Sequence, residues 1–257
     1  MSRTSQHEFH QYDSLFYRYQ REGSARSALA VLPLILSQLK ITSALDVGCG
    51  AAAWLSGYQR LGVADLLGID GDYVDRSLLM VDAARFQPRN ITQAFDLGRQ
   101  FDIVQCLEVA EHVPPATSAT LVDNIVRHSK CVLFSAAVPG QGGEDHINER
   151  SYAYWRDLFA ERGYRLFDFV RPPIQQNSEI ESWYRYNLLF FVHDSLIASL
   201  PAAISRCRVA DSEPVPDIAP LPYRVRKWIL RLLPEAAVSQ IAVWKHRQAV
   251  RALRQSA

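Results

Sequence analysis

The stretch that decides the fold reads ALDVGCG over residues 44–50. It begins as an apolar β-type run that contains Asp46, and it ends in a turn at Gly48 and Gly50, after which a helical pattern runs over residues 51–61. Glycines in such a turn let a ligand approach the backbone where a Cβ would collide, and the following helix offers free N–H groups. The stretch therefore predicts a strand, a ligand-binding turn and a helix.

A second acid strengthens this interpretation. Asp70, followed by Gly71, ends the next β-type run, about twenty residues downstream, where a carboxylate reaches both hydroxyls of a ribose. A nicotinamide or flavin site would normally show a third glycine, but Ala53 stands at that position. The two elements together predict a nucleoside ligand.

Short β-rich runs alternate with helical patterns from residue 41 to about residue 192, which is typical of strands joined by crossover helices. We expect an α/β fold: a Rossmann-like, seven-stranded, mostly parallel sheet with helices on both faces, plus a C-terminal helical tail. The expected strands are 43–47, 65–69, 91–95, 101–106, 131–136, 165–170 and 186–192. A helix over 24–39, with Pro33 inside it, precedes them.

Composition and charge divide the chain into four parts. An aromatic segment and helix (1–40) precede the main domain (41–200), a proline-rich linker (201–223) and a basic amphipathic tail (224–257). From residue 222 onward there are eight basic residues and one acid, a net charge of +7, which leaves the rest of the chain at −6. An acidic body disfavours nucleic acid as a partner. Because the motifs all precede the linker, we expect the chemistry of the main domain to survive loss of the tail.

The 257 residues are 48% hydrophobic and 21% charged, as in a folded globular protein. The four cysteines are widely spaced and form no cluster with histidine, so no disulfide framework and no metal site are predicted. No secretory leader or membrane-spanning run is evident. We expect a reduced, cytoplasmic protein, with peripheral contact at the inner membrane face left open.

Several motifs together resemble the class I S-adenosylmethionine-dependent methyltransferases over Tyr12 to His193. Residues 45–50 resemble the first motif and Asp70 the second; residues 95–97 resemble the adenine-binding motif, and residues 101–112 the fourth strand with its loop. The resemblance implies S-adenosylmethionine as cofactor and S-adenosylhomocysteine as product. The cofactor-binding residues that it implies are Tyr17, Asp46, Gly48, Cys49, Gly50, Asp70, Gly71, Phe95, Asp96, Leu97, Leu107 and Glu108.

The resemblance also implies roles. Asp96 would accept from the adenine amine, the backbone near Leu107 and Glu108 would receive the ammonium group, and Tyr17 would either close over the sulfonium by cation–π contact or pack on the first helix. The usual third glycine of the first motif is replaced by Ala52. We expect its methyl group to leave less room beside the methionine end.

Residues 134–155 resemble a bacterial subgroup that modifies saccharides or secondary metabolites. His112 and His146 are the candidate bases, because histidine titrates near neutrality. Alternatively, His112 only supports its loop, and His146 belongs to a lid. Asn148 and Glu149 either orient a substrate or cap a helix near Ser151. Residues 183–187 (WYRYN) either stack on an acceptor or pack under the sheet.

The leading hypothesis is methyl transfer to a small-molecule hydroxyl on a saccharide or secondary metabolite. One alternative is internal cyclisation of S-adenosylmethionine to a cyclic amino acid, with release of methylthioadenosine. Another is a non-catalytic S-adenosylmethionine-binding module. A small-molecule acceptor is the expected partner, the tail suits an anionic membrane or a biosynthetic partner, and a homodimer is left open.

Overall fold

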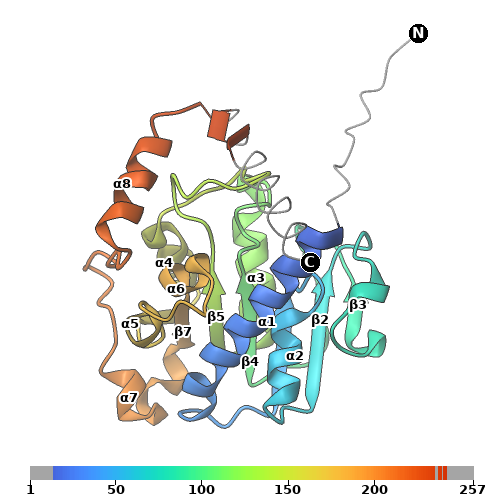
Figure 1. The fold of residues 1–257 in the computed structure, drawn as a ribbon. Helices are drawn as coiled ribbons and strands as arrows, with labels where there is room; N and C mark the ends of the chain where they lie inside the picture. The colour runs from blue at the N-terminus through green and yellow to red at the C-terminus, as the bar shows by residue number, and fades with distance from the viewer. Residues whose placement is uncertain (1–13, 235–236, 239, 242–257) are drawn as a thin grey trace.

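The computed structural model describes residues 14–234, 237–238 and 240–241 (Figure 1). Its centre is a seven-stranded sheet in the order β3-β2-β1-β4-β5-β7-β6. The strands are β1 (Ser43–Val47), β2 (Asp65–Asp70), β3 (Phe86–Pro88), β4 (Ile103–Leu107), β5 (Cys131–Ser135), β6 (Tyr164–Phe167) and β7 (Leu189–His193). All neighbours pair in parallel except β7, which is antiparallel to both β5 and β6. The predicted Rossmann-like, mostly parallel sheet is confirmed.

Helices lie on both faces of this sheet (Figure 1). The α-helices are α1 (Ser14–Leu36), α2 (Ala53–Arg60), α3 (Ser118–His128), α4 (Tyr152–Ala160), α5 (Arg171–Ile174), α6 (Ser182–Asn187), α7 (Ala202–Ser205) and α8 (Leu221–Leu230). The short 3₁₀ helices are η1 (Arg76–Leu78), η2 (Ala83–Arg85), η3 (Pro115–Thr117) and η4 (Asp194–Ser199). None of the helices in the described part of the chain is long and apolar enough to cross a membrane.

The strands alternate between two apolar layers. Ala44 of β1 packs in the layer with α1 and α2, whereas its neighbour Leu45 packs in the layer with α3 and α4. Successive strand side chains point to opposite faces, so a strand covered on both sides is apolar throughout. This explains the continuous apolar runs of the sequence.

The parallel strands bring four segments to one edge of the sheet. β1, β2, β4 and β5 run side by side in parallel, so their carboxyl ends lie at the same edge. The glycine turn follows β1, Asp70 ends β2, and the loops over 108–114 and 136–151 follow β4 and β5. Ligands of open α/β sheets bind at this edge.

The expected strand over 91–95 is wrong: the third strand is β3, at Phe86–Pro88. The segment instead bonds to side chains of α3. Asn124 accepts the Phe95 N–H and donates to the carbonyls of Ile91 and Gln93. Because these backbone groups are satisfied by a helix, they are not free to form a ladder.

The segment predicted as an extended linker has local structure of its own. It contains α7, and Val209 donates to the carbonyl of Leu166 while Asp168 donates to that of Cys207. The segment therefore pairs briefly with β6, an edge strand whose backbone groups would otherwise lack partners. The tail helix begins at Leu221, three residues before the predicted boundary, and residues 242–257 lie outside the described part of the chain.

Candidate functional site

The glycine turn after β1 adopts conformations that glycine favours. Gly48 has φ +82° and Gly50 has φ +51°. A Cβ on Gly48 would overlap the side chain of Val109 from the loop after β4, whereas a Cβ on Gly50 would meet nothing within 4 Å. Gly48 thus permits two loops to touch, and Gly50 faces open space that a ligand can enter.

Asp70 lies beside that open space. Its Oδ2 accepts the N–H of Gly50 at 2.7 Å, and its Oδ1 accepts the N–H of Gly71 at 2.7 Å and the hydroxyl of Tyr73 at 2.5 Å. The Tyr73 ring is mostly exposed and packs over Gly71. Two backbone N–H groups hold the carboxylate in place. Its third partner is the Tyr73 hydroxyl, which donates a hydrogen bond as a ribose hydroxyl would.

Three residues of the first motif have buried side chains. The Cys49 sulfur packs against Gly68 of β2, and burial raises the pKa of the Cys49 thiol well above its usual range. Asp46 is buried beside Gln105, and its burial and the nearby Asp70 raise the pKa of its carboxyl to about 7. Ala52 is left-handed (φ +60°) and fully buried in the apolar layer. Its methyl group therefore packs into the core, and its effect on the room beside the methionine end stays a prediction.

The segment proposed for adenine is held by α3. Phe95 stacks on His128 with ring centroids 5.3 Å apart, and His128 Nε2 accepts the N–H of Leu97 at 3.0 Å. Asp96 is exposed and accepts the N–H of Gly98 at 2.7 Å. His128, for which no role was predicted, therefore fixes this loop. The adenine contact of Asp96 stays a prediction.

The loop after β4 begins with a left-handed residue, Glu108 (φ +54°), whose N–H donates to the carbonyl of Ser135 at 2.9 Å. Its carboxylate accepts from Gln141 at 3.0 Å and from Asn187 at 3.2 Å, and the two amides bond to each other at 2.8 Å. Burial raises the pKa of the Glu108 carboxyl. The sequence pointed to the backbone of Leu107 and Glu108; it missed this side-chain network.

Three titratable side chains meet beyond that network. Glu111, His112 and His146 bring one ligand atom each to within 4.8 Å of one another. Burial raises the pKa of Glu111 well above its usual range, and the Glu108 carboxylate raises it further. Burial lowers the pKa of His112 to about 4, with a further contribution from His146. The two predicted bases are thus neighbours, with ring centroids 4.9 Å apart.

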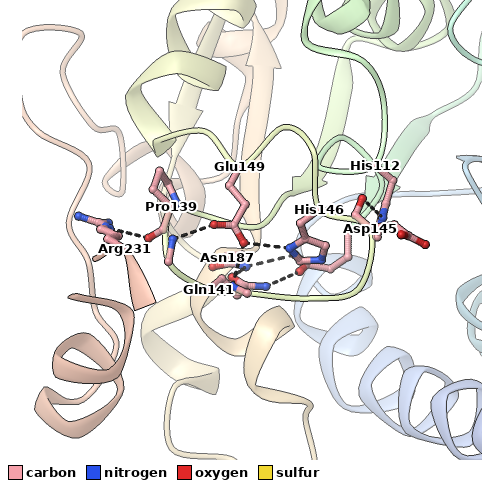
Figure 2. Close-up of polar contacts among 11 residues, drawn as sticks. His112, Pro139, Gln141, Asp145, His146, Glu149, Asn187 and Arg231 are labelled. Atoms are coloured by element: carbon pink, nitrogen blue, oxygen red, sulfur yellow. Dashed lines mark hydrogen bonds and ion pairs between the residues drawn. The ribbon is translucent and has the colours of Figure 1, made fainter. Parts of the chain in front are cut away.

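Glu149 organises the loop after β5 (Figure 2). Its carboxylate accepts the N–H groups of Gly140 and Gly142 at 2.7 and 2.8 Å and bonds to Nδ1 of His146 at 3.0 Å. Asn148 is buried and donates to the Ala110 carbonyl at 3.0 Å. The helix cap is Ser151, which accepts the N–H of Tyr154. The expectation that Asn148 or Glu149 caps this helix is therefore wrong, because both side chains are used in holding loops together.

A pocket of about 370 Å³ lies between this loop and α8. His146 and Asn148 line it on the loop side, and Leu230 and Arg231 line it on the α8 side. Arg231 donates to the carbonyl of Pro139 at 2.7 Å (Figure 2). Lys227 pairs with Asp217 at 2.6 Å. The tail helix thus forms one wall of the pocket.

The aromatic segment at 183–187 serves mainly in packing. Tyr184 is buried against Trp54, with its hydroxyl 3.0 Å from that of Ser24, and Tyr186 is buried beside Tyr223. The packing alternative is confirmed for these two rings. The side chain of Tyr17 lies outside the described part of the chain, so its sulfonium contact stays a prediction.

The edge of the sheet fits S-adenosylmethionine. Gly50 leaves the space that a Cβ would enter, and the fixed Asp70 carboxylate stands beside it at the position where a ribose is bound in such sheets. The Tyr73 hydroxyl is a partner of Asp70 that a ribose hydroxyl can replace without breaking the turn.

Comparison with known proteins gives a family match and a set of more distant relatives. Residues 17–169 match Methyltransf_23, a methyltransferase domain. A ubiquinone biosynthesis O-methyltransferase of Acinetobacter baylyi is 35% identical over 100 residues, 35% of this chain and 42% of the relative. The chain thus spans less than half of that relative's length. The protein of the same name from Stutzerimonas stutzeri is 27% identical over 207 residues, 72% of this chain and 83% of the relative.

Two solved structures share the fold. The sugar N-methyltransferase KedS8 from Streptoalloteichus superposes with a TM-score of 0.53 at 19% identity, over 75% of this chain and 98% of that one. Streptomyces venezuelae DesVI superposes with a TM-score of 0.50 at 15% identity, over 70% and 95%.

Proposed function

The chain belongs to the class I S-adenosylmethionine-dependent methyltransferases of the Methyltransf_23 family, and from that premise we propose that it methylates a hydroxyl group of a small-molecule acceptor. The acceptor is a saccharide or a secondary metabolite. It binds in the pocket between the 139–150 loop and α8, and its hydroxyl reaches the His112–His146 pair.

The observation that carries this proposal is the position of His146. Its Nδ1 is held by the Glu149 carboxylate, and its ring lies at the pocket wall and beside His112. An acceptor hydroxyl must lose its proton during transfer, and a paired imidazole at the pocket is suited to that step. The O-methyltransferases among the curated relatives support the choice of oxygen as the acceptor atom.

The rest of the mechanism is positioning. The bound cofactor supplies an electrophilic methyl group on a sulfonium, so the protein needs to hold the acceptor oxygen in line with it. Asp70 binds the ribose, and the turn at Gly48 and Gly50 lets the backbone approach the ligand. The loops after β4 and β5 exclude water from the reacting atoms.

The test is a product-resolved assay of S-adenosylmethionine turnover, with the protein alone and with extracts of candidate acceptors. S-adenosylhomocysteine and a methyl ether, formed only with acceptor, support the proposal. Methylthioadenosine formed without acceptor would support the cyclisation alternative instead. Tight cofactor binding with no turnover against any acceptor would indicate a binding module.

A further inference from the structure

The acceptor pocket is lined by two arginines, one on each of its walls. Arg150 belongs to the loop after β5, which forms one wall, and Arg231 caps α8, which forms the other. Both line the same cavity of about 370 Å³ as His146. We propose that the acceptor is an organic anion, a hydroxylated molecule with a carboxylate or a phosphate group, and that Arg150 and Arg231 bind that group. This inference rests on the proposed function, because it takes His146 as the base and this cavity as the acceptor site.

Arg150 is held in position by the loop to which it belongs. Its Nε donates to Oδ1 of Asn148 at 2.9 Å, and its guanidinium lies over the Tyr154 ring, 5.1 Å from the ring centroid. Asn148 is itself buried and donates to the Ala110 carbonyl and the Ser118 hydroxyl, both at 3.0 Å. These contacts fix Nε and one face of the guanidinium. Its Nη groups can therefore bind a ligand with little further loss of side-chain entropy.

Arg231 is held by the same loop from the α8 side. Its Nε donates to the carbonyl of Pro139 at 2.7 Å (Figure 2). Its Cγ packs on Gly140, where an added Cβ would lie 2.8 Å from it. A guanidinium that is fixed through Nε still presents the two N–H donors of its Nη groups. That fork matches the two oxygens of a carboxylate or a phosphate.

The positive charge of the pocket lacks a counter-ion. Glu149 is the one acid among the described lining residues, and its oxygens accept two glycine N–H groups of the loop and bond to Nδ1 of His146. Neither Arg150 nor Arg231 forms an ion pair within the described part of the chain. Two cations and one occupied carboxylate give the cavity a net positive charge, which attracts an anionic ligand.

The apolar part of the lining suits the carbon skeleton of such an acceptor. Leu230 and Leu233 line the α8 side, and Ile147, which is 54% exposed, lines the loop side. Apolar walls with a few polar groups that fix orientation are typical of small-molecule sites of this volume. An anionic group bound by the two arginines would orient the rest of the acceptor along the wall that holds His146. This positioning would bring its hydroxyl to the base.

The first experiment determines the charge of the acceptor before its identity is known. A cell extract that supports methyl ether formation from S-adenosylmethionine is passed over a strong anion exchanger at mildly alkaline pH. We expect the acceptor activity to be retained and to elute with salt. Treatment with phosphodiesterase and phosphatase should abolish the retained activity of a phosphate ester and leave that of a carboxylate. Acceptor activity found only in the unretained fraction would overturn the proposal and leave the proposed function intact.

The second experiment assigns the charge to the two arginines, with the retained fraction as acceptor. Arg150→Gln and Arg231→Gln should each raise the apparent KM for the acceptor at least about tenfold and leave kcat within about threefold, because they remove a charge-assisted contact to a group remote from the reacting atoms. Arg231→Lys keeps the charge and should recover part of the loss. Arg224→Gln is the matched control, because it removes an exposed arginine of the same helix outside the described lining.

Calorimetry with S-adenosylhomocysteine verifies that each variant is folded. An unchanged KM in both glutamine variants would overturn the role of the arginines. A fall in kcat that Arg231→Lys does not recover, with KM unchanged, would also overturn it, because it would show that the side chain only holds α8 on the loop.

Binding measured without turnover covers the case in which no fraction yields a methyl ether. Protein saturated with S-adenosylhomocysteine is titrated by calorimetry with glucuronate, with inorganic phosphate and with glucose. We expect saturable binding of at least one of the two anions, weakened by Arg150→Gln, and none of glucose over the same concentrations. Anion binding without any methyl ether would count against the proposed function and leave the anion site intact. Equal results for glucose and both anions would overturn the anion site.

Discussion

At the scale of single residues, Asp70 connects the sequence motif to binding. Its carboxylate is fixed by the N–H groups of Gly50 and Gly71, so it meets a ribose in one orientation with little loss of side-chain entropy. Tyr73 occupies one oxygen with a hydroxyl that a ribose hydroxyl can replace. The acid therefore serves both the turn and the ligand.

We expect Asp70→Ala to weaken binding of S-adenosylhomocysteine by about 2 kcal/mol or more, roughly thirtyfold, because hydrogen bonds to a charged group are lost. Titration calorimetry measures this directly. Asp72→Ala is the matched control, since it removes a carboxylate two positions away that is exposed and paired with Arg76. Equal affinity in the Asp70 variant and the wild type would show that the ribose lies elsewhere.

Asp46 gives a prediction for stability against pH. Its carboxyl has a pKa of about 7 in the folded protein, raised mainly by burial, against 3.8 in a solvated chain. The folded state therefore holds this proton more tightly, and its contribution to stability is present below about pH 4 and is lost as pH rises toward 7. Asp46→Asn should escape that loss. Relative to wild type it should gain roughly 2 to 4 kcal/mol in unfolding free energy between pH 4 and pH 8.

Urea unfolding of both proteins across that pH range, without cofactor, measures the difference. If the difference in unfolding free energy between Asp46→Asn and wild type stays constant with pH, the prediction is contradicted, whatever the size of that difference.

The motif residues could be predicted from the sequence, but their partners could not. Asp46, Gly48, Gly50 and Asp70 stand at fixed spacings around two strand ends, so local pattern is enough to find them. Glu111 and His146 meet only because β4 and β5 are neighbours in the sheet, and nothing in their spacing along the chain indicates it. His128 was given no role for the same reason: its partner Leu97 is thirty-one residues away.

At the scale of elements, the predicted strand over 91–95 shows what apolar pattern misses. The run has the composition of a strand, but the Asn124 side chain of α3 takes its backbone hydrogen bonds. The sheet edge is completed instead by three residues, Phe86–Pro88, too few to give a periodic signal. Tertiary contacts decide such short elements.

The contact between the 139–150 loop and α8 gives a prediction at this scale. Gly140 has φ +80°, and a Cβ there would overlap the carbonyl oxygen of Lys227 and lie 2.8 Å from Cγ of Arg231. We expect Gly140→Ala to cost at least about 2 kcal/mol of stability, from left-handed strain plus the clash, and to release α8 from the loop. Hydrogen exchange of the α8 amides and urea unfolding measure both effects.

Gly98→Ala is the control for backbone strain alone. Gly98 has φ +66° with nothing within 4 Å of the added Cβ, so this variant should lose only about 1 kcal/mol. If the two alanine variants unfold at the same urea concentration and exchange alike, the close packing of α8 on the loop is contradicted.

At the scale of the whole molecule, α8 has two faces with different surroundings. Lys227, Leu230 and Arg231 face the domain and are bonded or buried there. Trp228 and Ile229 are 61% and 49% exposed, and Leu232 is exposed beside them. The sequence suggested a tail that is dispensable for methyl transfer, but the inner face builds a wall of the pocket. Ending the chain at Pro220 should therefore lower turnover. It should leave cofactor affinity within about threefold, because the glycine turn follows β1, which β4 separates from β5 and the loop that α8 contacts.

The outer face of α8, with Trp228, Ile229 and the neighbouring Leu232, leads us to expect binding to anionic membranes. Exposed apolar side chains next to Arg224 and Arg226 suit the interface of an anionic membrane, where each basic residue contributes on the order of 1 kcal/mol. We expect the wild type to sediment with vesicles containing phosphatidylserine or phosphatidylglycerol, and less with neutral phosphatidylcholine vesicles or at high salt. The double variant Trp228→Gln, Ile229→Gln should bind at least about tenfold more weakly, because it removes two side chains that would be buried in the interface. Its turnover on a soluble acceptor should be unchanged, since neither side chain faces the pocket. If the wild type does not sediment with anionic vesicles, the membrane role fails; if the double variant loses turnover as well, the outer face belongs to the fold or to a dimer contact.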